Sequence, residues 1–175
     1  MKNHLTILKL TISFIFLFGT LTSNGQAKIE AQIGGANFLG LTLNAAYDIS
    51  ISKNGNHFLT PSFGLGLLAP GWNASTIIIH TGLNYNFKRF GLGVELSGFN
   101  ENPFFADEHN ESFVDIIIYP NANYTFINKE HWYFRFSGGI YLAYSKTYDD
   151  NTDTNHMSFD GDPVPGAGIT VGYKF

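Results

Sequence analysis

The sequence predicts an all-β fold, an eight-stranded antiparallel up-and-down transmembrane β-barrel. Apolar and polar residues alternate with a period of two through most of the chain after residue 27, which is the pattern of strands with two different faces. The alternating segments number eight, and each is long enough to cross a bilayer as a tilted strand. Tight turns and long loops alternate between them, which is typical of barrels in the outer membrane.

The first 27 residues are set apart from the rest of the chain. A basic start and an apolar stretch over 12–21 are followed by small and polar residues, an order typical of secretory signal peptides. The stretch is shorter than the roughly 20 residues of a spanning helix. We therefore expect 1–27 to be a secretory signal peptide, cleaved after Gly25 or Ala27, and 28–175 to form the barrel.

The composition excludes several classes of site and partner. The chain has no Cys, so disulfides and thiolate metal sites are impossible. Residues 1–27 hold two lysines and no acid, so the rest of the chain carries a net charge of −6, against −4 for the whole. Because nucleic-acid binding needs a basic face, we expect no nucleic-acid partner.

The predicted strands follow one another with the same two-residue period. In the clearest of them, apolar side chains from Leu39 to Ile51 alternate with small and polar ones, and no helical period fits this run. In chain order the predicted strands span residues 28–36, 39–52, 57–68, 76–87, 90–100, 112–126, 132–145 and 163–175.

Each strand is justified by its apolar face and by the turn that follows it. The apolar faces of the first four strands begin with Ile29, Leu39, Leu59 and Ile77, and those of the last four with Phe90, Val114, Trp132 and Ile169. The segments KNGN, KR and NKEH supply tight turns, while longer polar segments supply the loops on the other side. Pro61 and Pro120 lie inside predicted strands, where each removes one ladder donor, so we expect local irregularity there.

The apolar faces are expected to face lipid and the polar faces the lumen. Gly, Ser, Thr and Asn with single charges dominate the polar faces, and an eight-stranded barrel has a lumen just wide enough for such side chains. A soluble ligand-binding barrel of the lipocalin kind would have to pack all the apolar side chains into that lumen, which is too small to hold them. Aromatic residues gather near the short-turn ends and predict an interfacial girdle: Tyr85, Phe87, Tyr124, Phe126, Trp132, Tyr173 and Phe175.

Together, the leader, the eight strands, the short turns and the terminal aromatic resemble the small outer-membrane β-barrels of Gram-negative bacteria, the OmpA/OmpX-type group. This resemblance implies location in the cell outer membrane, contact with lipid and lipopolysaccharide, and recognition of the C-terminal strand by the barrel-assembly machinery. Tyr173 and Phe175 match the usual form of that strand. Thr170 stands where a Gly is usual, with Gly168 and Gly172 on either side.

Polar side chains on the inward faces form two candidate clusters. Folding the strands about the KR turn places His80 opposite Ser97, with Glu95 beside them. This set is either a hydrogen-bonded cluster in the lumen or the Ser–His–acid set of a lipid-A-modifying hydrolase. Glu95, Asp115 and Arg135 come from consecutive strands, and we expect them to form an Arg–carboxylate network that plugs the barrel, with a narrow gated pore as the alternative. Lys174 is expected within reach of Glu30.

The long acidic segment near the C-terminus is a candidate cation site. Asp149, Asn151, Asp153 and Asp160, with Asn155, have the spacing of oxygen ligands in an EF-hand loop. Thr154 occupies the position of the usual turn Gly, and the alternative is a solvated acidic loop. We therefore expect no cofactor, and a weakly bound Ca²⁺ is the alternative that this spacing offers.

The expected role is therefore structural or surface-interacting, with no enzymatic activity. The long loops would supply the contacts, with Phe104, Phe105 and Phe159 as candidate contact residues for an extracellular partner.

Overall fold

The computed structural model describes residues 25–52, 54–68, 76–99, 116–149, 154–159 and 162–175. Apart from one short 3₁₀ helix, η1 (Gly35–Asn37), the regular elements are strands. The strands are β1 (Gly25–Gly34), β2 (Leu41–Ser50), β3 (His57–Leu67), β4 (Ile77–Phe87), β5 (Phe90–Phe99), β6 (Ile116–Asn128), β7 (Trp132–Asp149), β8 (Thr154–Phe159) and β9 (Val164–Lys174).

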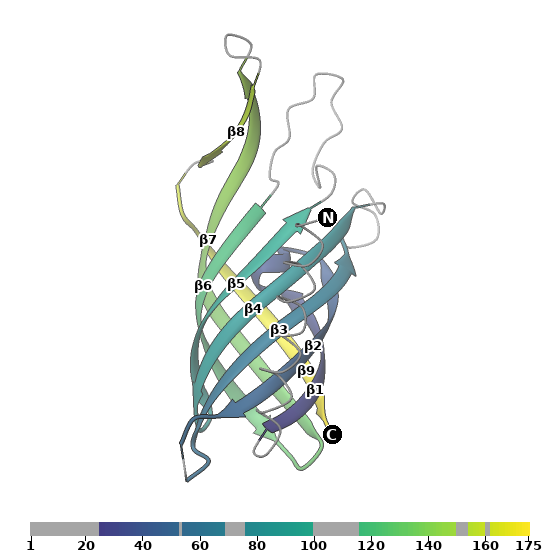
Figure 1. The fold of residues 1–175 in the computed structure, drawn as a ribbon, viewed down its shortest axis with the longest axis vertical. Helices are drawn as coiled ribbons and strands as arrows, with labels where there is room; N and C mark the ends of the chain where they lie inside the picture. The colour runs from purple at the N-terminus through teal and green to yellow at the C-terminus, as the bar shows by residue number, and fades with distance from the viewer. Residues whose placement is uncertain (1–24, 53, 69–75, 100–115, 150–153, 160–161) are drawn as a thin grey trace, which may run out of the picture.

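Eight of these strands close into one antiparallel up-and-down barrel, as the sequence predicts (Figure 1). Consecutive strands from β1 to β7 pair as neighbours, β7 pairs with β9, and β9 returns to β1. The closing ladder runs from Lys28 opposite Lys174 to Gly34 opposite Gly168. Closure gives every barrel strand two neighbours, so the barrel itself has no free edge.

The prediction of strand positions is confirmed to within a few residues, with local exceptions. β1 begins at Gly25, three residues before the predicted 28, and β6 continues to Asn128. A register shift in the ladder between β6 and β7 falls between Thr125 and Ile127. Such a bulge places one extra residue on a strand and breaks the alternation, which is why Phe126 and Ile127 are both exposed.

The two prolines that the sequence places inside strands, Pro61 and Pro120, each lie where one ladder is interrupted. The pairs between β2 and β3 stop at Ala46 opposite Ser62 and resume at Ile49 opposite Leu59, so they skip Pro61. The pairs between β6 and β7 likewise skip Pro120. Since proline has no N–H to donate, the expected irregularity is confirmed.

The last connection differs from the loop that the sequence predicts. β7 is 18 residues long and continues past the barrel to Asp149, where it pairs with β8. The two strands form a hairpin that projects beyond the barrel at the end opposite the short turns (Figure 1). Thr147 and Tyr148 favour extended backbone, and the hairpin satisfies backbone groups that a loop would leave to water.

The connection between β1 and β2 turns into the barrel instead of away from it. Gly34 and Gly35 have φ values of 75° and 60°, which L-residues with side chains adopt only with strain. The turn places Ala36 and Asn37 of η1 at 0 % exposure. A Cβ on Gly34 would overlap the carbonyl oxygen of Ala167, so this position needs glycine for space as well as for φ.

The two faces of the barrel are distributed as predicted, with the polar face inside. Glu30, His80, Glu95, Ser97 and Arg135 are all 5 % exposed or less. Large apolar side chains from the same strands stand exposed on the outside, including Leu43, Phe63, Leu83, Phe90, Leu92, Val94 and Phe136. The fold therefore has its polar groups where a soluble domain has its core.

Candidate functional site

The centre of the lumen holds a buried ion pair between neighbouring parts of the closed sheet. Arg135 on β7 donates through Nη2 to Oε2 of Glu30 on β1, at 3.3 Å. The hydroxyl of Tyr133, also on β7, donates to the other carboxylate oxygen of Glu30. Because all three side chains are 5 % exposed or less, each buried charge has a partner, as a low-dielectric lumen requires.

Of the predicted network of Glu95, Asp115 and Arg135, the structure describes Glu95 and Arg135, and these two form no direct ion pair with each other. Among the described residues, Arg135 forms its ion pair with Glu30, from a strand that lies two positions away around the barrel by way of β9. Asp115 lies outside the described residues. Closure decides this outcome, because it brings the first strand against the last ones at a distance of 105 residues along the chain.

Glu95 instead accepts hydrogen bonds from neutral groups. Gln32 on β1 donates to Glu95 Oε2 at 2.7 Å, and the backbone N–H of Ala36 in η1 donates to the same oxygen at 3.4 Å. The side-chain amide of Asn44 on β2 donates to Oε1 of Gln32 at 3.3 Å. A β1 side chain and the inward turn of η1 therefore each supply a donor to this buried carboxyl group.

His80 and Ser97 lie within hydrogen-bond distance, as predicted. The direction of their hydrogen bonds, however, is not that of a catalytic Ser–His pair, in which the serine donates to the histidine. His80 Nδ1 lies 3.1 Å from Ser97 Oγ, and Ser97 Oγ donates to Asn37 Oδ1 at 2.8 Å. A hydroxyl has one proton to donate, so His80 Nδ1 must itself be the donor to Ser97. His80 Nε2 is buried without a protein partner in the described part of the chain, and Glu95 bonds elsewhere.

An apolar cluster fills the lumen above this polar layer, toward the end with the long loops. We did not predict it as a core from the sequence, because its members lie in apolar runs such as the two triple-isoleucine segments. The parity of the strands could have found it, since Ile78 and Ile117 share the inward face with His80 and Tyr119. The cluster consists of Ala36, Leu68, Ile78, Phe99, Ile117 and Tyr119, with Phe38, Tyr141 and Ala143 packed against it.

The opposite mouth of the lumen, at the short-turn end, is lined by charged and amide side chains. Lys28 forms an ion pair with Asp48 at 2.5 Å, and Thr60 donates to the same carboxylate at 2.7 Å. Lys174 donates to the side-chain oxygen of Asn128. The expected contact between Lys174 and Glu30 is therefore wrong, because Lys174 stands opposite Lys28, two residues nearer the mouth than Glu30, which stands opposite Gly172.

The aromatic side chains predicted as a girdle gather at the short-turn end, where several contact one another within and across strands. Trp132 packs edge-on against Tyr173 at 5.0 Å between ring centroids, and Tyr173 against Phe175 at 5.2 Å. Phe126 meets Phe134 at 5.2 Å. The other members, Tyr85, Phe87 and Tyr124, are outward-facing and 38–42 % exposed.

Most of the candidate cation ligands lie outside the residues that the structure describes. Asn151, Asp153 and Asp160 lie outside the described residues, and so do Phe104 and Phe105. The backbone of Asp149 pairs with Thr154 at the end of the β7–β8 hairpin, Asn155 lies in β8, and Phe159 ends that strand. Within the described segments, no three His, Asp or Glu residues gather closely enough to hold a metal ion.

Comparisons with known proteins identify no relative. No model of a protein family matches the sequence. Neither the curated proteins nor the solved structures include one with significant similarity to this chain. In the residues that the structure describes, no helix is both long and apolar enough to span a membrane.

Proposed function

We propose that this chain is a small integral outer-membrane β-barrel protein with a filled lumen, acting in a structural or surface-interaction role. The observation that carries the proposal is the inverted distribution of polarity. Leu43, Phe63 and Leu92 are 58–65 % exposed, whereas Glu30, Glu95 and Arg135 are 5 % exposed or less. Water disfavours that much contiguous apolar surface, and lipid does not.

The dimensions and the girdle agree with a bilayer. The barrel strands have at least 10 residues each, which matches the 9–11 that a tilted strand needs to cross the hydrocarbon. Trp132, Tyr173 and Phe175 stand at the short-turn end, where the amphipathic rings of Trp and Tyr are favoured between lipid and water. The short turns would then face the periplasm and the β7–β8 hairpin the outside, near lipopolysaccharide.

Contents of the lumen favour a closed barrel over a narrow pore. The apolar cluster around Ile78 and Tyr119, the layer of His80 and Ser97, and the ion pair of Glu30 and Arg135 follow one another along the axis. An eight-stranded barrel leaves little space beyond such side chains. Purified protein in liposomes should therefore show no conductance, and steady single-channel currents would support the pore instead.

The proposed location and orientation can be tested with single cysteines, because the chain contains none. Gly55→Cys lies in a short turn where nothing stands within 4 Å of the added Cβ, and Ser158→Cys lies in β8 at the other end. We expect a membrane-impermeant maleimide to label Ser158→Cys on intact cells, and Gly55→Cys only after the outer membrane is permeabilised. Recovery of both variants in the soluble fraction would contradict the proposal.

The alternative of a lipid-A-modifying hydrolase is tested by comparing lipid A from cells with the gene, without it, and with Ser97→Ala. We expect identical acyl patterns in the mass spectra. The burial of Ser97 at 0 % exposure and the donation of its proton to Asn37 support this expectation. A pattern that changes with the gene and again with Ser97→Ala would establish the hydrolase.

A further inference from the structure

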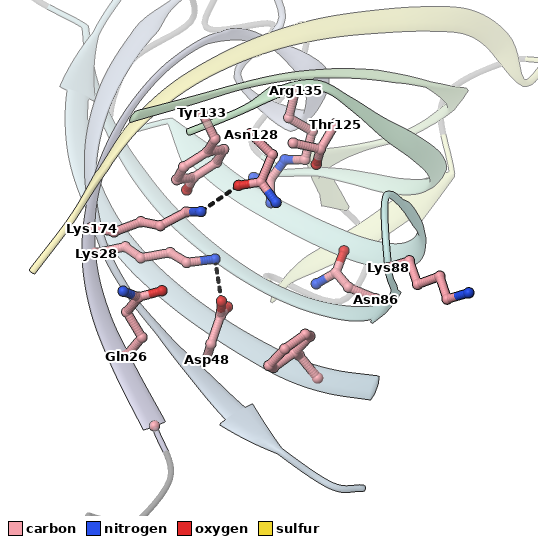
Figure 2. A pocket seen from close by; sticks show the side chains of 12 residues that line it. Gln26, Lys28, Asp48, Asn86, Lys88, Thr125, Asn128, Tyr133, Arg135 and Lys174 are labelled. Atoms are coloured by element: carbon pink, nitrogen blue, oxygen red, sulfur yellow. Dashed lines mark hydrogen bonds and ion pairs between the residues drawn. The ribbon is translucent and has the colours of Figure 1, made fainter. Parts of the chain in front are cut away.

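At the short-turn end the lumen opens into a cavity of about 250 Å³. Figure 2 shows the side chains around it, with the ammonium groups of Lys28 and Lys174 directed into the same space. Asn86, Thr125 and Asn128 supply neutral polar groups from β4 and β6. None of the roles proposed above for the barrel uses this cavity.

The two lysines are held together by the closing ladder of the barrel. Lys28 on β1 stands directly opposite Lys174 on β9, and like charges placed opposite each other destabilise a sheet. The ring of Tyr133 lies close to both, with its centroid 4.8 Å from Lys28 Nζ and 5.7 Å from Lys174 Nζ. An aromatic face attracts both ammonium groups but adds no negative charge.

Among the described side chains that line the cavity, two cations, Lys174 and Lys88, form no ion pair with a carboxylate side chain. Arg135 is neutralised by Glu30 and Lys28 by Asp48. Lys174 donates to neutral oxygens, the side chain of Asn128 and the carbonyl of Lys129, the latter at 3.2 Å. Lys88 adds a second positive charge at the rim of the cavity, and its ammonium group points away from the other two (Figure 2).

We propose that this cavity binds a small phosphate-bearing anion from the aqueous space at the short-turn end. Lys174 offers positive charge inside the cavity to a phosphate monoester, which carries about −1.5 to −2 at pH 7, and Lys88 adds positive charge at the rim. The volume is at the small end of ligand pockets, which fits inorganic phosphate or a small monoester. The inference depends on the folded barrel alone and not on its location in a membrane.

Calorimetry of the folded barrel in detergent, titrated with inorganic phosphate at low ionic strength, tests the proposal. We expect saturable binding in the millimolar range, which high chloride weakens because salt screens the lysines. Lys174→Gln should weaken binding about tenfold, the effect of losing one charge-assisted hydrogen bond. Lys129→Gln is the matched control, since Lys129 is an exposed cation at the same end that does not line the cavity.

Three results would overturn the proposal. One is the absence of saturable heat up to tens of millimolar phosphate. Another is equal weakening by Lys174→Gln and Lys129→Gln, which indicates a diffuse ion atmosphere. The third is a response to vesicles containing phosphatidylglycerol without any response to inorganic phosphate, which indicates a lipid headgroup. The gel mobility of unheated samples shows whether each variant folds. If Lys174→Gln does not fold, Lys88→Gln takes its place, with a smaller expected loss of affinity.

Discussion

The carboxylate of Glu30 is the group on which the charge balance of the lumen depends. It accepts from Arg135 and from the hydroxyl of Tyr133, and it is 1 % exposed. Removing one partner of a buried ion pair leaves the other as an unpaired charge in a medium of low dielectric constant, which costs more than the pair itself contributes. Glu95, in contrast, is held by Gln32 and a backbone N–H, both neutral.

Glu30→Gln should therefore destabilise the barrel by about 3 kcal/mol, because Arg135 loses the carboxylate to which it is hydrogen-bonded. Urea unfolding of the detergent-folded protein, followed by loss of the compact gel band, measures the change. Glu130→Gln, at an exposed turn position, is the control and should change stability by less than about 0.5 kcal/mol.

A double-mutant cycle shows which of the two lumen carboxylates, Glu30 or Glu95, interacts with Arg135. Arg135→Met should couple strongly to Glu30→Gln and weakly to Glu95→Gln, since a contact appears as non-additivity. Stronger coupling to Glu95 would mean that the network predicted from the sequence, and not the observed pair, carries the charge balance.

The element that closes the lumen is the short connection between β1 and β2. η1 has only three residues, yet Ala36 and Asn37 reach Glu95 and Ser97 on β5. Two glycines with positive φ make the inward turn possible. Asn37 is also tied back to β2 by a bond of 2.8 Å from its Nδ2 to Thr42 Oγ1, so the connection is part of the packed interior.

Gly34→Ala tests how tightly this connection is packed. We expect a loss of roughly 2 kcal/mol or more, because a Cβ at positive φ is strained and this one would also overlap the carbonyl oxygen of Ala167. Gly55→Ala is a matched control, since Gly55 has a φ of 65° with nothing within 4 Å. Equal losses of unfolding free energy in the two variants would show that only the backbone conformation matters.

Over the whole molecule, the inverted polarity makes stability depend on the solvent around the barrel. Leu83 lies near the middle of β4, faces outward and is 49 % exposed. Ile51 also faces outward, at 56 % exposure, but lies beyond the end of β2 near the short turns. In water these two positions would tolerate polar residues equally well, whereas a bilayer distinguishes them by depth.

Leu83→Lys should consequently cost about 2–4 kcal/mol for the barrel in lipid vesicles, and Ile51→Lys about 0–1 kcal/mol. Guanidinium unfolding in vesicles, followed by tryptophan fluorescence, measures both. Equal effects at the two positions would contradict the proposed depth of the barrel in the membrane.

The sequence by itself determined which residues face in and which face out. Successive side chains of a strand point to opposite faces, so the alternation sorted the residues into two faces. The composition of those faces, the size of the lumen and the aromatic girdle then assigned His80, Ser97 and Arg135 to the lumen. The tight turn after Phe87 also set the register that brings His80 opposite Ser97, because a short hairpin leaves little freedom of pairing.

Only the tertiary structure decided which inward residues meet across the lumen. The partner of Arg135, the donors to Glu95 and the pairing of Lys28 with Lys174 all depend on how β1 meets β9 and how far η1 turns inward. Those contacts join residues far apart in the chain, and the stagger of a closed barrel sets them. Local sequence carries the two-residue period of each strand, while the height at which distant strands meet is a property of the closed sheet.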